Sequence, residues 1–499
     1  MRIAFLYPRW TGEYGLFRHF ARRNSTWPPM NLALLGAMAE KYGHEVVIVD
    51  GQAEDLDENQ MVSRALSTKA DIYGLTCYSP FFHLNVSLAK RLKQIDPKIP
   101  IIAGGPHITI TKEEALLPQF DYLFVGESEK SLPNFLNAYQ KGGDLSNIEG
   151  TIFKKDGKII VGHPQWVETK LQIKGSNVGE ENALDQFPFP ARHLLPMKKY
   201  RLGTMDGRMY FAPIQTMRGC PWKCIFCASE ALNTTRVITR SPGSVVDEIK
   251  QVISDYPFVT HIYFLDDVLT LWEKHIIEIC DLIIKDGLKI TFEGSTRANL
   301  VNEELIKYMV KAGLVRLSFG LETVDSEMRK TMKKKVPLEA YSDANKTCEK
   351  FGVEAINSCM IGLPGETRET IRNTLNWLKE AREVKQVNFA IAIPYPGTEF
   401  SDIALSGAHG MELTSKDFSK YRRYGSAVTK VGDLTPEDLI ELQNEGFVSI
   451  YSAPWRWIPM FKKHGVIGWI LMMVRVLKLV SSKLFKRKPK PYSSHPKSS

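Results

Sequence analysis

The stretch Arg218-Gly-Cys220-Pro-Trp-Lys-Cys224-Ile-Phe-Cys227 decides the fold of this chain. It spaces three cysteines as Cys-x3-Cys-x2-Cys, so one short loop supplies three thiolates. A cubane iron–sulfur cluster has four irons and normally takes four cysteine ligands. Three close cysteines without a fourth leave one iron open to nitrogen and oxygen donors. We therefore predict that Cys220, Cys224 and Cys227 hold a [4Fe-4S] cluster.

Other uses of these cysteines fit the sequence less well. A structural zinc site takes four ligands, usually as two pairs, and there is no second pair. A disulfide needs an oxidising compartment, whereas we expect a cytoplasmic protein without a signal peptide. The chain has only seven cysteines in 499 residues, and the other four lie in apolar segments and are predicted to be small buried residues: Cys77, Cys280, Cys348 and Cys359.

The region around the loop, residues 210–400, alternates apolar strands with helical patterns. Six strands are expected, at 214–217, 262–265, 290–292, 315–319, 354–361 and 386–393. Strands and helices in this order predict an α/β fold, here a partial (β/α)6 TIM-type barrel. Chemistry in such barrels gathers at the carboxyl ends of the strands.

The cysteine loop strongly resembles that of the radical S-adenosylmethionine superfamily. Asp266-Asp267, Ser318-Phe-Gly-Leu-Glu322 and Gly362-Leu-Pro-Gly-Glu366 resemble the same family. The resemblance implies that the open iron holds the amine and carboxylate of S-adenosylmethionine.

Polar residues at the predicted strand ends suit this cofactor. Carboxylates match its amine and ribose, Arg297 matches its carboxylate, and Phe226 fits an aromatic contact near adenine. Taken alone, each acidic residue could equally be a helix N-cap or lie in a solvated loop. The predicted cofactor-binding residues of this region are Phe226, Asp266, Asp267, Glu293, Ser295, Arg297, Glu322 and Gly362.

Residues 1–147 predict a separate doubly wound, Rossmann-like parallel sheet. Strands are expected at 3–7, 46–49, 72–76, 101–103 and 122–125, with helices between them. Ligands bind such sheets at the carboxyl ends of the strands, and on this pattern alone the ligand could be a nucleotide, a flavin or something larger. The predicted ligand-binding residues are Tyr78, Ser79, Gly104, Gly105, His107, Gly126 and Glu127.

Several phrases of this domain resemble the cobalamin-binding domain that precedes the cluster domain in one branch of the superfamily. They are Pro28-Pro-Met-Asn-Leu, Gly43-His-Glu-Val, Gly104-Gly-Pro-His107 and Val125-Gly-Glu-Ser-Glu129. Many cobalamin proteins carry Asp-x-His-x-x-Gly after the first strand, but this chain has no His there. The resemblance therefore implies cobalamin without a protein His on cobalt, or a domain that kept the fold and lost the ligand.

Residues 148–209 are expected to be a linker, with a hairpin over 151–161 and a stiff strap at Phe187-Pro-Phe-Pro190. Residues 401–499 predict a mainly helical region, with a helix beginning near Thr435. Eleven of the 65 Lys and Arg residues, and none of the 56 acidic ones, follow Glu445. This local basic tail argues against a nucleic-acid groove. It suits an amphipathic helix on an anionic membrane surface, or a docked helix with a basic end.

Together these features predict a cobalamin-dependent radical S-adenosylmethionine enzyme. The resemblance implies that a 5′-deoxyadenosyl radical removes hydrogen from an unactivated carbon and that methylcobalamin supplies a methyl group. The tail suggests a lipid, isoprenoid-like or other small apolar substrate, or a natural product. A flavodoxin- or ferredoxin-type donor would reduce the cluster. The alternatives are a ring-forming enzyme of the porphyrin-cyclase type and a cobalamin-binding sensor with a structural cluster.

Overall fold

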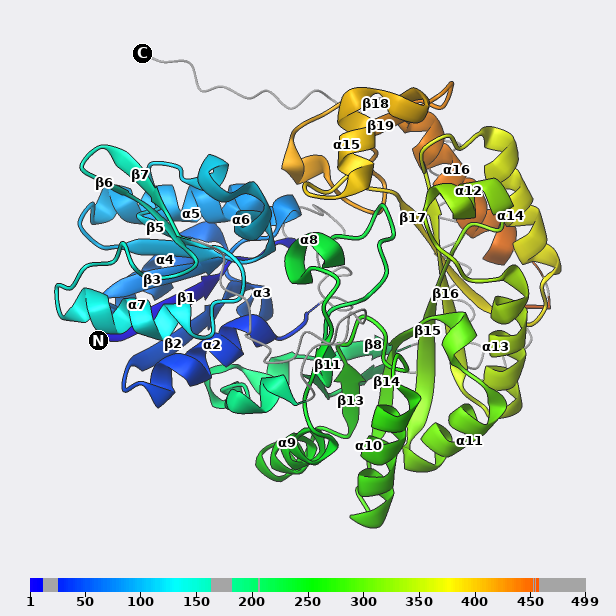
Figure 1. The fold of residues 1–499 in the computed structure, drawn as a ribbon, viewed down its shortest axis with the longest axis horizontal. Helices are drawn as coiled ribbons and strands as arrows, with labels where there is room; N and C mark the ends of the chain where they lie inside the picture. The colour runs from blue at the N-terminus through cyan, green and yellow to red at the C-terminus, as the bar shows by residue number, and fades with distance from the viewer. Residues whose placement is uncertain (12–25, 163–181, 205–206, 452, 454, 457–499) are drawn as a thin grey trace, which may run out of the picture.

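The computed structural model describes residues 1–11, 26–162, 182–204, 207–451, 453 and 455–456. Figure 1 shows two α/β bodies side by side, with a helical region near the C-terminus packed on the second. This arrangement confirms the predicted fold class.

The first body is built on a seven-stranded sheet with the order β2-β1-β3-β4-β5-β6-β7. Its first five strands are parallel: β1 Arg2–Tyr7, β2 Glu45–Asp50, β3 Ile72–Thr76, β4 Ile101–Gly104 and β5 Tyr122–Phe124. The helices of this body are α2 Met30–Lys41, α3 Gly51–Glu54, α4 Glu58–Ser67, α5 Phe82–Ile95, α6 Pro106–Thr111 and α7 Ser131–Gln140.

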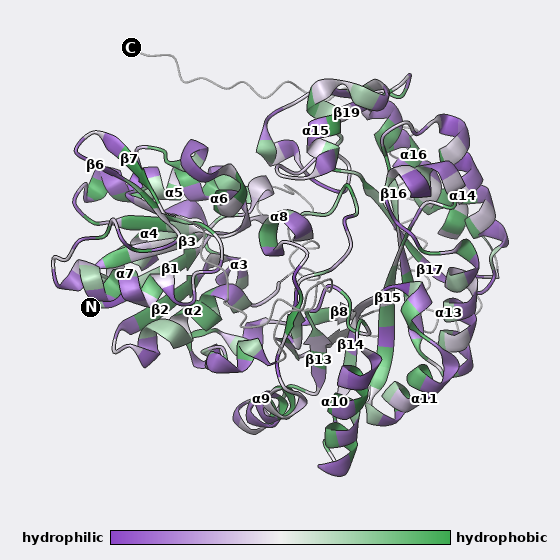
Figure 2. Cartoon of the chain, in the orientation of Figure 1, coloured by the Kyte–Doolittle hydropathy of each residue, from purple (hydrophilic) through white to green (hydrophobic). Residues whose placement is uncertain are grey.

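The central strands of this first sheet are rich in hydrophobic residues (Figure 2). Ile3, Ala4, Phe5 and Leu6 of β1 are all buried, and they divide between two core clusters. A strand buried on both faces is typical of a parallel sheet covered by helices. The predicted doubly wound arrangement is thereby confirmed.

The hairpin that we expected in the linker is present, but it extends the first sheet. Its strands are β6 Thr151–Lys155 and β7 Lys158–Val161, and β6 pairs antiparallel with β5. The reason is burial, because Ile152 and Phe153 pack into the first body while the outer strand stays largely exposed.

The second body holds a six-stranded parallel sheet in sequential order. Its strands are β10 Phe211–Ile214, β13 His261–Phe264, β14 Thr291–Thr296, β15 Leu314–Glu322, β16 Glu354–Ile361 and β17 Gln386–Ile391. The accompanying helices are α9 Pro242–Asp255, α10 Glu273–Lys285, α11 Glu303–Ala312, α12 Ser326–Thr331, α13 Leu338–Lys350 and α14 Arg368–Glu380. The two edge strands, β10 and β17, do not pair with each other, so over the described residues the sheet is an open barrel.

Five short elements lie beside these sheets: two precede β10 and three lie between β10 and α9. They are β8 Leu202–Thr204, β9 Gly207–Met209, β11 Met217–Arg218, α8 Ser229–Asn233 and β12 Ile238–Thr239. The C-terminal region adds α15 Glu399–Ser406, β18 Met411–Leu413, β19 Thr429–Val431 and α16 Pro436–Tyr451.

The helix predicted near Thr435 is α16, and side-chain bonds stabilise its first turn. Asp438 accepts from the Thr435 amide at 3.0 Å, and Thr435 Oγ1 accepts from the Asp438 amide at 3.2 Å. The amphipathic helix predicted in the basic tail, over residues 466–486, lies outside the described residues. Within the described part of the chain, no helix is long and apolar enough to cross a membrane.

Candidate cofactor site between the two bodies

The cysteine loop lies between β11 and α8, close to where the two bodies meet (Figure 1). Backbone bonds hold its middle. The Ile225 amide donates to the Met332 carbonyl at 3.3 Å, and the Phe400 amide donates to the Ile225 carbonyl at 2.9 Å. The loop is therefore fixed to the end of α12 and the start of α15.

The three loop cysteines are free thiols that interact electrostatically with one another. Burial raises the pKa of Cys220, and burial with nearby Asp267 raises the pKa of Cys227 to about 11. Because metal ligands must be thiolates, a bound metal would have to drive their deprotonation. Among the described residues, no three His, Cys, Asp or Glu side chains converge closely enough for a single ion. The donor set fits a [4Fe-4S] cluster, three of whose irons would each take one thiolate.

The other four cysteines are buried in the two bodies, as predicted. Burial raises the pKa of the Cys77 and Cys359 thiols above the ordinary range. They are apolar core residues.

Asp266 and Asp267 follow β13 and have different surroundings. Asp266 is buried and accepts from the Thr216 amide at 2.7 Å, the Thr216 hydroxyl at 2.5 Å and the Met217 amide at 3.1 Å. Burial raises its pKa to about 6. Asp267 accepts a hydrogen bond from the Ser229 hydroxyl at 3.0 Å, and its charge helps to raise the pKa of Cys227. Asp266 thus anchors the base of the loop, while Asp267 lies near Cys220 and Cys227.

Glu293, Ser295 and Arg297 lie at alternate positions along the same face at the end of β14. Glu293 is paired with Arg316 at 2.6 Å, so its carboxylate is occupied by the protein. Arg297 is 8% exposed, and its Cζ lies 4.0 Å from the ring centroid of Trp222 in the cysteine loop. Its Nε is buried without a hydrogen-bond partner, which leaves this guanidinium available to a ligand.

Glu322, at the end of β15, is engaged by a residue that the sequence did not single out. Lys334 Nζ lies 2.7 Å from the Glu322 carboxylate and 5.9 Å from the Phe226 ring centroid. It also interacts electrostatically with Cys224, and the neighbouring carboxylate raises the pKa of Lys334 despite burial. Lys334 lies within the run Lys333-Lys-Lys335, which resembles an exposed charged segment, so the sequence does not predict that this lysine is buried at the site.

Gly362 forms a turn after β16. Its φ of 92° favours glycine. The Glu366 carboxylate accepts from the Gly362 amide at 2.6 Å and from the Leu363 amide at 3.0 Å. The Gly-Leu-Pro-Gly-Glu phrase is thus a turn closed by its own last residue.

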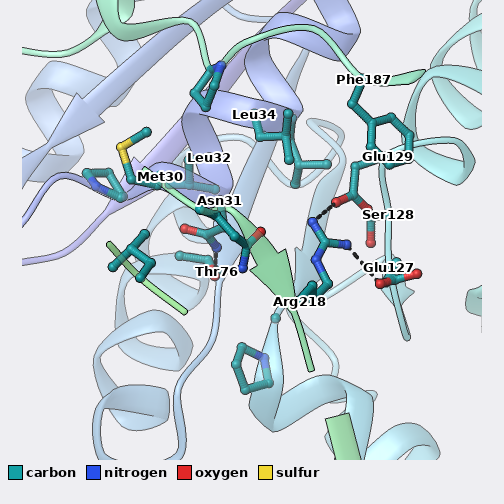
Figure 3. Close-up of a pocket in the computed structure, with 18 of the residues that line it drawn as sticks. Met30, Asn31, Leu32, Leu34, Thr76, Glu127, Ser128, Glu129, Phe187 and Arg218 are labelled. Atoms are coloured by element: carbon teal, nitrogen blue, oxygen red, sulfur yellow. Dashed lines mark hydrogen bonds and ion pairs between the residues drawn. The ribbon is translucent and has the colours of Figure 1, made fainter. Parts of the chain in front are cut away.

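A cavity of about 600 Å³ lies between the two bodies. The carboxyl ends of the first sheet and the start of α2 line it, as does Arg218 (Figure 3). Asp267 of the second body also lines it. The strap at 187–190 also lines it. Of the predicted ligand-binding residues, the cavity brings together Tyr78, Gly104, Gly105, Gly126 and Glu127.

The walls fit a large organic cofactor. At Gly105 the backbone packs closely against the end of β3, because φ is 97° and a Cβ would lie 2.8 Å from Thr76 Oγ1. Asn31 donates to Thr76 Oγ1 at 2.8 Å, which fixes the start of α2 beside this turn (Figure 3). Apolar walls with a few convergent polar groups, at this volume, are usual for cofactor sites.

His107 and Ser79 do not line this cavity. Ser79 Oγ lies 3.0 Å from His107 Nδ1, and the His107 ring packs against Phe82 and Phe418. Burial lowers the pKa of His107 to about 4, so it is neutral at pH 7. These contacts tie the first body to the C-terminal region.

Family profiles match both bodies. A profile described as the Radical SAM superfamily matches residues 214–378, and one described as the B12 binding domain matches residues 20–136.

Curated relatives match most of the chain. An uncharacterized methyltransferase of Pyrococcus horikoshii is 32% identical over 89% of this chain and 92% of its own. An anaerobic magnesium-protoporphyrin IX monomethyl ester cyclase of Rubrivivax gelatinosus is 27% identical over 84% and 72%. The hopanoid C-3 methylase of Methylococcus capsulatus is 27% identical over 78% and 70%.

Solved structures share the fold. The radical S-adenosylmethionine methyltransferase TsrM from Kitasatospora setae, with cobalamin and a [4Fe-4S] cluster bound, matches with a TM-score of 0.68. Its identity is 16%, over 91% of this chain and 88% of that one. The cobalamin-dependent S-adenosylmethionine radical enzyme OxsB matches with a TM-score of 0.68 and 15% identity, over 97% and 80%.

Proposed function

Because this chain belongs to the cobalamin-binding radical S-adenosylmethionine superfamily, we propose that it methylates an unactivated carbon of an apolar or natural-product substrate. Its cofactors are a [4Fe-4S] cluster, S-adenosylmethionine and cobalamin. When bound, they supply a carbon-centred radical and a methyl group, and the protein positions and shields them.

One observation carries this proposal: a single cavity is lined by the strand ends of the first body and by Arg218 and Gly219, which immediately precede Cys220 in the second. Gly104 and Gly105 lie on one wall and Asp267 on another. This arrangement supports two cofactors facing a common space, which is what transfer between them requires.

The side chains around the loop support defined roles in binding S-adenosylmethionine. Arg297, with its buried unpartnered Nε, would receive a carboxylate. Asp267 would accept hydrogen bonds from an amine or a ribose. The strap at 187–190 would exclude water from the cavity. No side chain needs to act as a general base.

Three finer features of the proposal rest on sequence. The cluster needs an external one-electron donor, and its chemistry needs anaerobic conditions. The basic residues after Glu445 support a cytoplasmic enzyme at an anionic membrane surface, where an apolar substrate would be found.

A ring-forming reaction on the same cofactors is the second proposed function. It is supported by relatives described as anaerobic magnesium-protoporphyrin IX monomethyl ester cyclases, which match up to 94% of this chain. The two reactions differ in whether the methyl group of S-adenosylmethionine enters the product.

The test uses anaerobically reconstituted protein, methyl-labelled S-adenosylmethionine and a cell lipid extract. Methylation predicts label in a product and none with the Cys224→Ala variant. Label recovered only in methionine, together with 5′-deoxyadenosine, would rule out methylation and favour ring formation. No 5′-deoxyadenosine above the Cys224→Ala level would rule out both and favour a sensor.

A further inference from the structure

Arg218 connects the two bodies at the edge of the shared cavity. Its Nη1 lies 2.8 Å from a Glu127 oxygen, and its Nη2 lies 2.8 Å from a Glu129 oxygen (Figure 3). Both carboxylates are 8% exposed and the guanidinium is 15% exposed.

The four charges of this group are balanced and come from distant parts of the chain. Arg236 adds a second cation, 3.5 Å from Glu127. Glu127 and Glu129 follow β5 in the first body, whereas Arg218 and Arg236 flank the cysteine loop in the second. We call these four residues the interbody clamp. Removing one member of a buried pair leaves an uncompensated charge, so the clamp constrains both bodies.

Only Gly219 separates Arg218 from the first cysteine. Its φ is 97°, and a Cβ there would overlap the Arg236 carbonyl oxygen. The start of the cysteine loop is therefore packed directly against the second cation of the clamp. A shift of the Arg218 backbone would therefore be passed through Gly219 to Cys220.

The clamp also faces the cavity, because Glu127, Glu129 and Arg218 all line it. A ligand that fills the cavity rests against the same groups that hold the start of the cysteine loop at Arg218. Occupancy at one site therefore changes the energy of the arrangement needed at the other.

We propose that Arg218 is a positioning residue that couples cobalamin binding to cluster binding through the interbody clamp. The inference rests on the proposed function, since it takes cobalamin as the ligand of the cavity and a cluster as the ligand of the cysteines. Coupling is reciprocal: each cofactor strengthens binding of the other.

The test compares the cobalamin Kd before and after anaerobic reconstitution of the cluster, read from cobalamin absorbance in equilibrium dialysis. For the wild type we expect cobalamin to bind at least about fivefold more tightly with the cluster present. For Arg218→Met we expect a ratio near one. Arg218→Lys should give an intermediate ratio, because an ammonium cannot hold two carboxylates as a planar fork.

Arg316→Met is the matched control. Arg316 is also a partly buried arginine between two carboxylates, Glu293 and Glu354, but all three belong to the second body. Its loss should leave the ratio at the wild-type value, whatever it does to stability.

A wild-type ratio within about twofold of one, or an Arg218→Met ratio equal to the wild-type ratio, would overturn the coupling. If circular dichroism shows that Arg218→Met is unfolded, Arg218→Lys and Glu129→Gln test the coupling in its place. Both should lower the ratio of cobalamin affinities measured with and without the cluster. A ratio of one with tight cobalamin binding refutes only the coupling. Absence of cobalamin binding in both states refutes the proposed function instead.

Discussion

Replacement of Asp266 separates an anchoring role from a cofactor-binding role. Its carboxylate accepts from the amides of Thr216 and Met217 and from the Thr216 hydroxyl. Asp266→Asn keeps the shape and keeps Oδ1, which accepts both amides. Asp266→Ala removes every acceptor. If Asp266 anchors the loop, the two variants should differ strongly in stability.

The expected magnitudes follow from burial. Alanine leaves two buried amides unpaired, at about 1–3 kcal/mol each, so Asp266→Ala should lose roughly 2–6 kcal/mol. Burial raises the Asp266 pKa from 3.8 to about 6. Ionisation at pH 8 therefore costs the folded state roughly 3 kcal/mol. Asparagine avoids that cost, so Asp266→Asn should be at least as stable as the wild type at pH 8.

The pH dependence has a definite sign. Because the folded pKa is raised, the stability contributed by this carboxyl is complete below about pH 4 and is lost as pH rises through about 6. The advantage of Asp266→Asn over the wild type should therefore grow between pH 4 and pH 7.

The assay is urea unfolding of cluster-free protein at several pH values, followed by far-UV circular dichroism. Asp267→Asn is the control, since Asp267 accepts only from Ser229 among the described hydrogen bonds and faces the cysteines. It should weaken S-adenosylmethionine binding with little change in unfolding. Equal destabilisation by Asp266→Asn and Asp266→Ala at pH 8 would refute the anchoring role.

Three further predictions concern buried charges. Lys334→Met leaves the Glu322 carboxylate buried without its cation and should lower the free energy of unfolding by about 3–5 kcal/mol. The double variant Lys334→Met/Glu322→Gln should restore most of that loss. If the two substitutions instead destabilise additively in urea unfolding, Lys334 and Glu322 are not paired. Burial raises the Glu366 pKa to about 7, so the free energy of unfolding of the wild type should fall as pH rises from about 4.5 to 7. Glu366→Gln should abolish that pH dependence. An unchanged pH dependence in the variant would show that Glu366 is not its source. Burial lowers the His107 pKa to about 4, so the free energy of unfolding should fall as pH drops from 6.5 toward 4. His107→Gln, whose side chain can still form a hydrogen bond with Ser79, should remove this acid-induced fall. If the fall persists in the variant, His107 is not its source.

The strands were predictable because hydrophobic runs and their spacing are local properties. The first barrel strand shows the limit. The sequence predicts a strand at 214–217, but β10 ends at Ile214. The amides of Thr216 and Met217 instead donate to Asp266, 50 and 49 residues away, and no local sequence pattern predicts these bonds.

The sequence indicates a candidate site where a motif carries the chemistry, as at Cys220, Cys224 and Cys227, and their role as cluster ligands stays a prediction. It was not predictable where distant charges meet. The partners of Arg218 lie 91 and 89 residues upstream, at Glu127 and Glu129. Each of these residues alone resembles a solvated surface charge, and only the packing of the two bodies makes them a buried group.

The central claim is that one chain holds a three-cysteine cluster and cobalamin on either side of one cavity. The most direct measurement is the iron and cobalt content of anaerobically reconstituted protein with saturating cobalamin. We expect about four iron ions and one cobalt per chain. The Cys220→Ala/Cys224→Ala/Cys227→Ala variant should lose the iron and keep the cobalt. Wild-type protein that retains iron but takes up no cobalt would contradict the account.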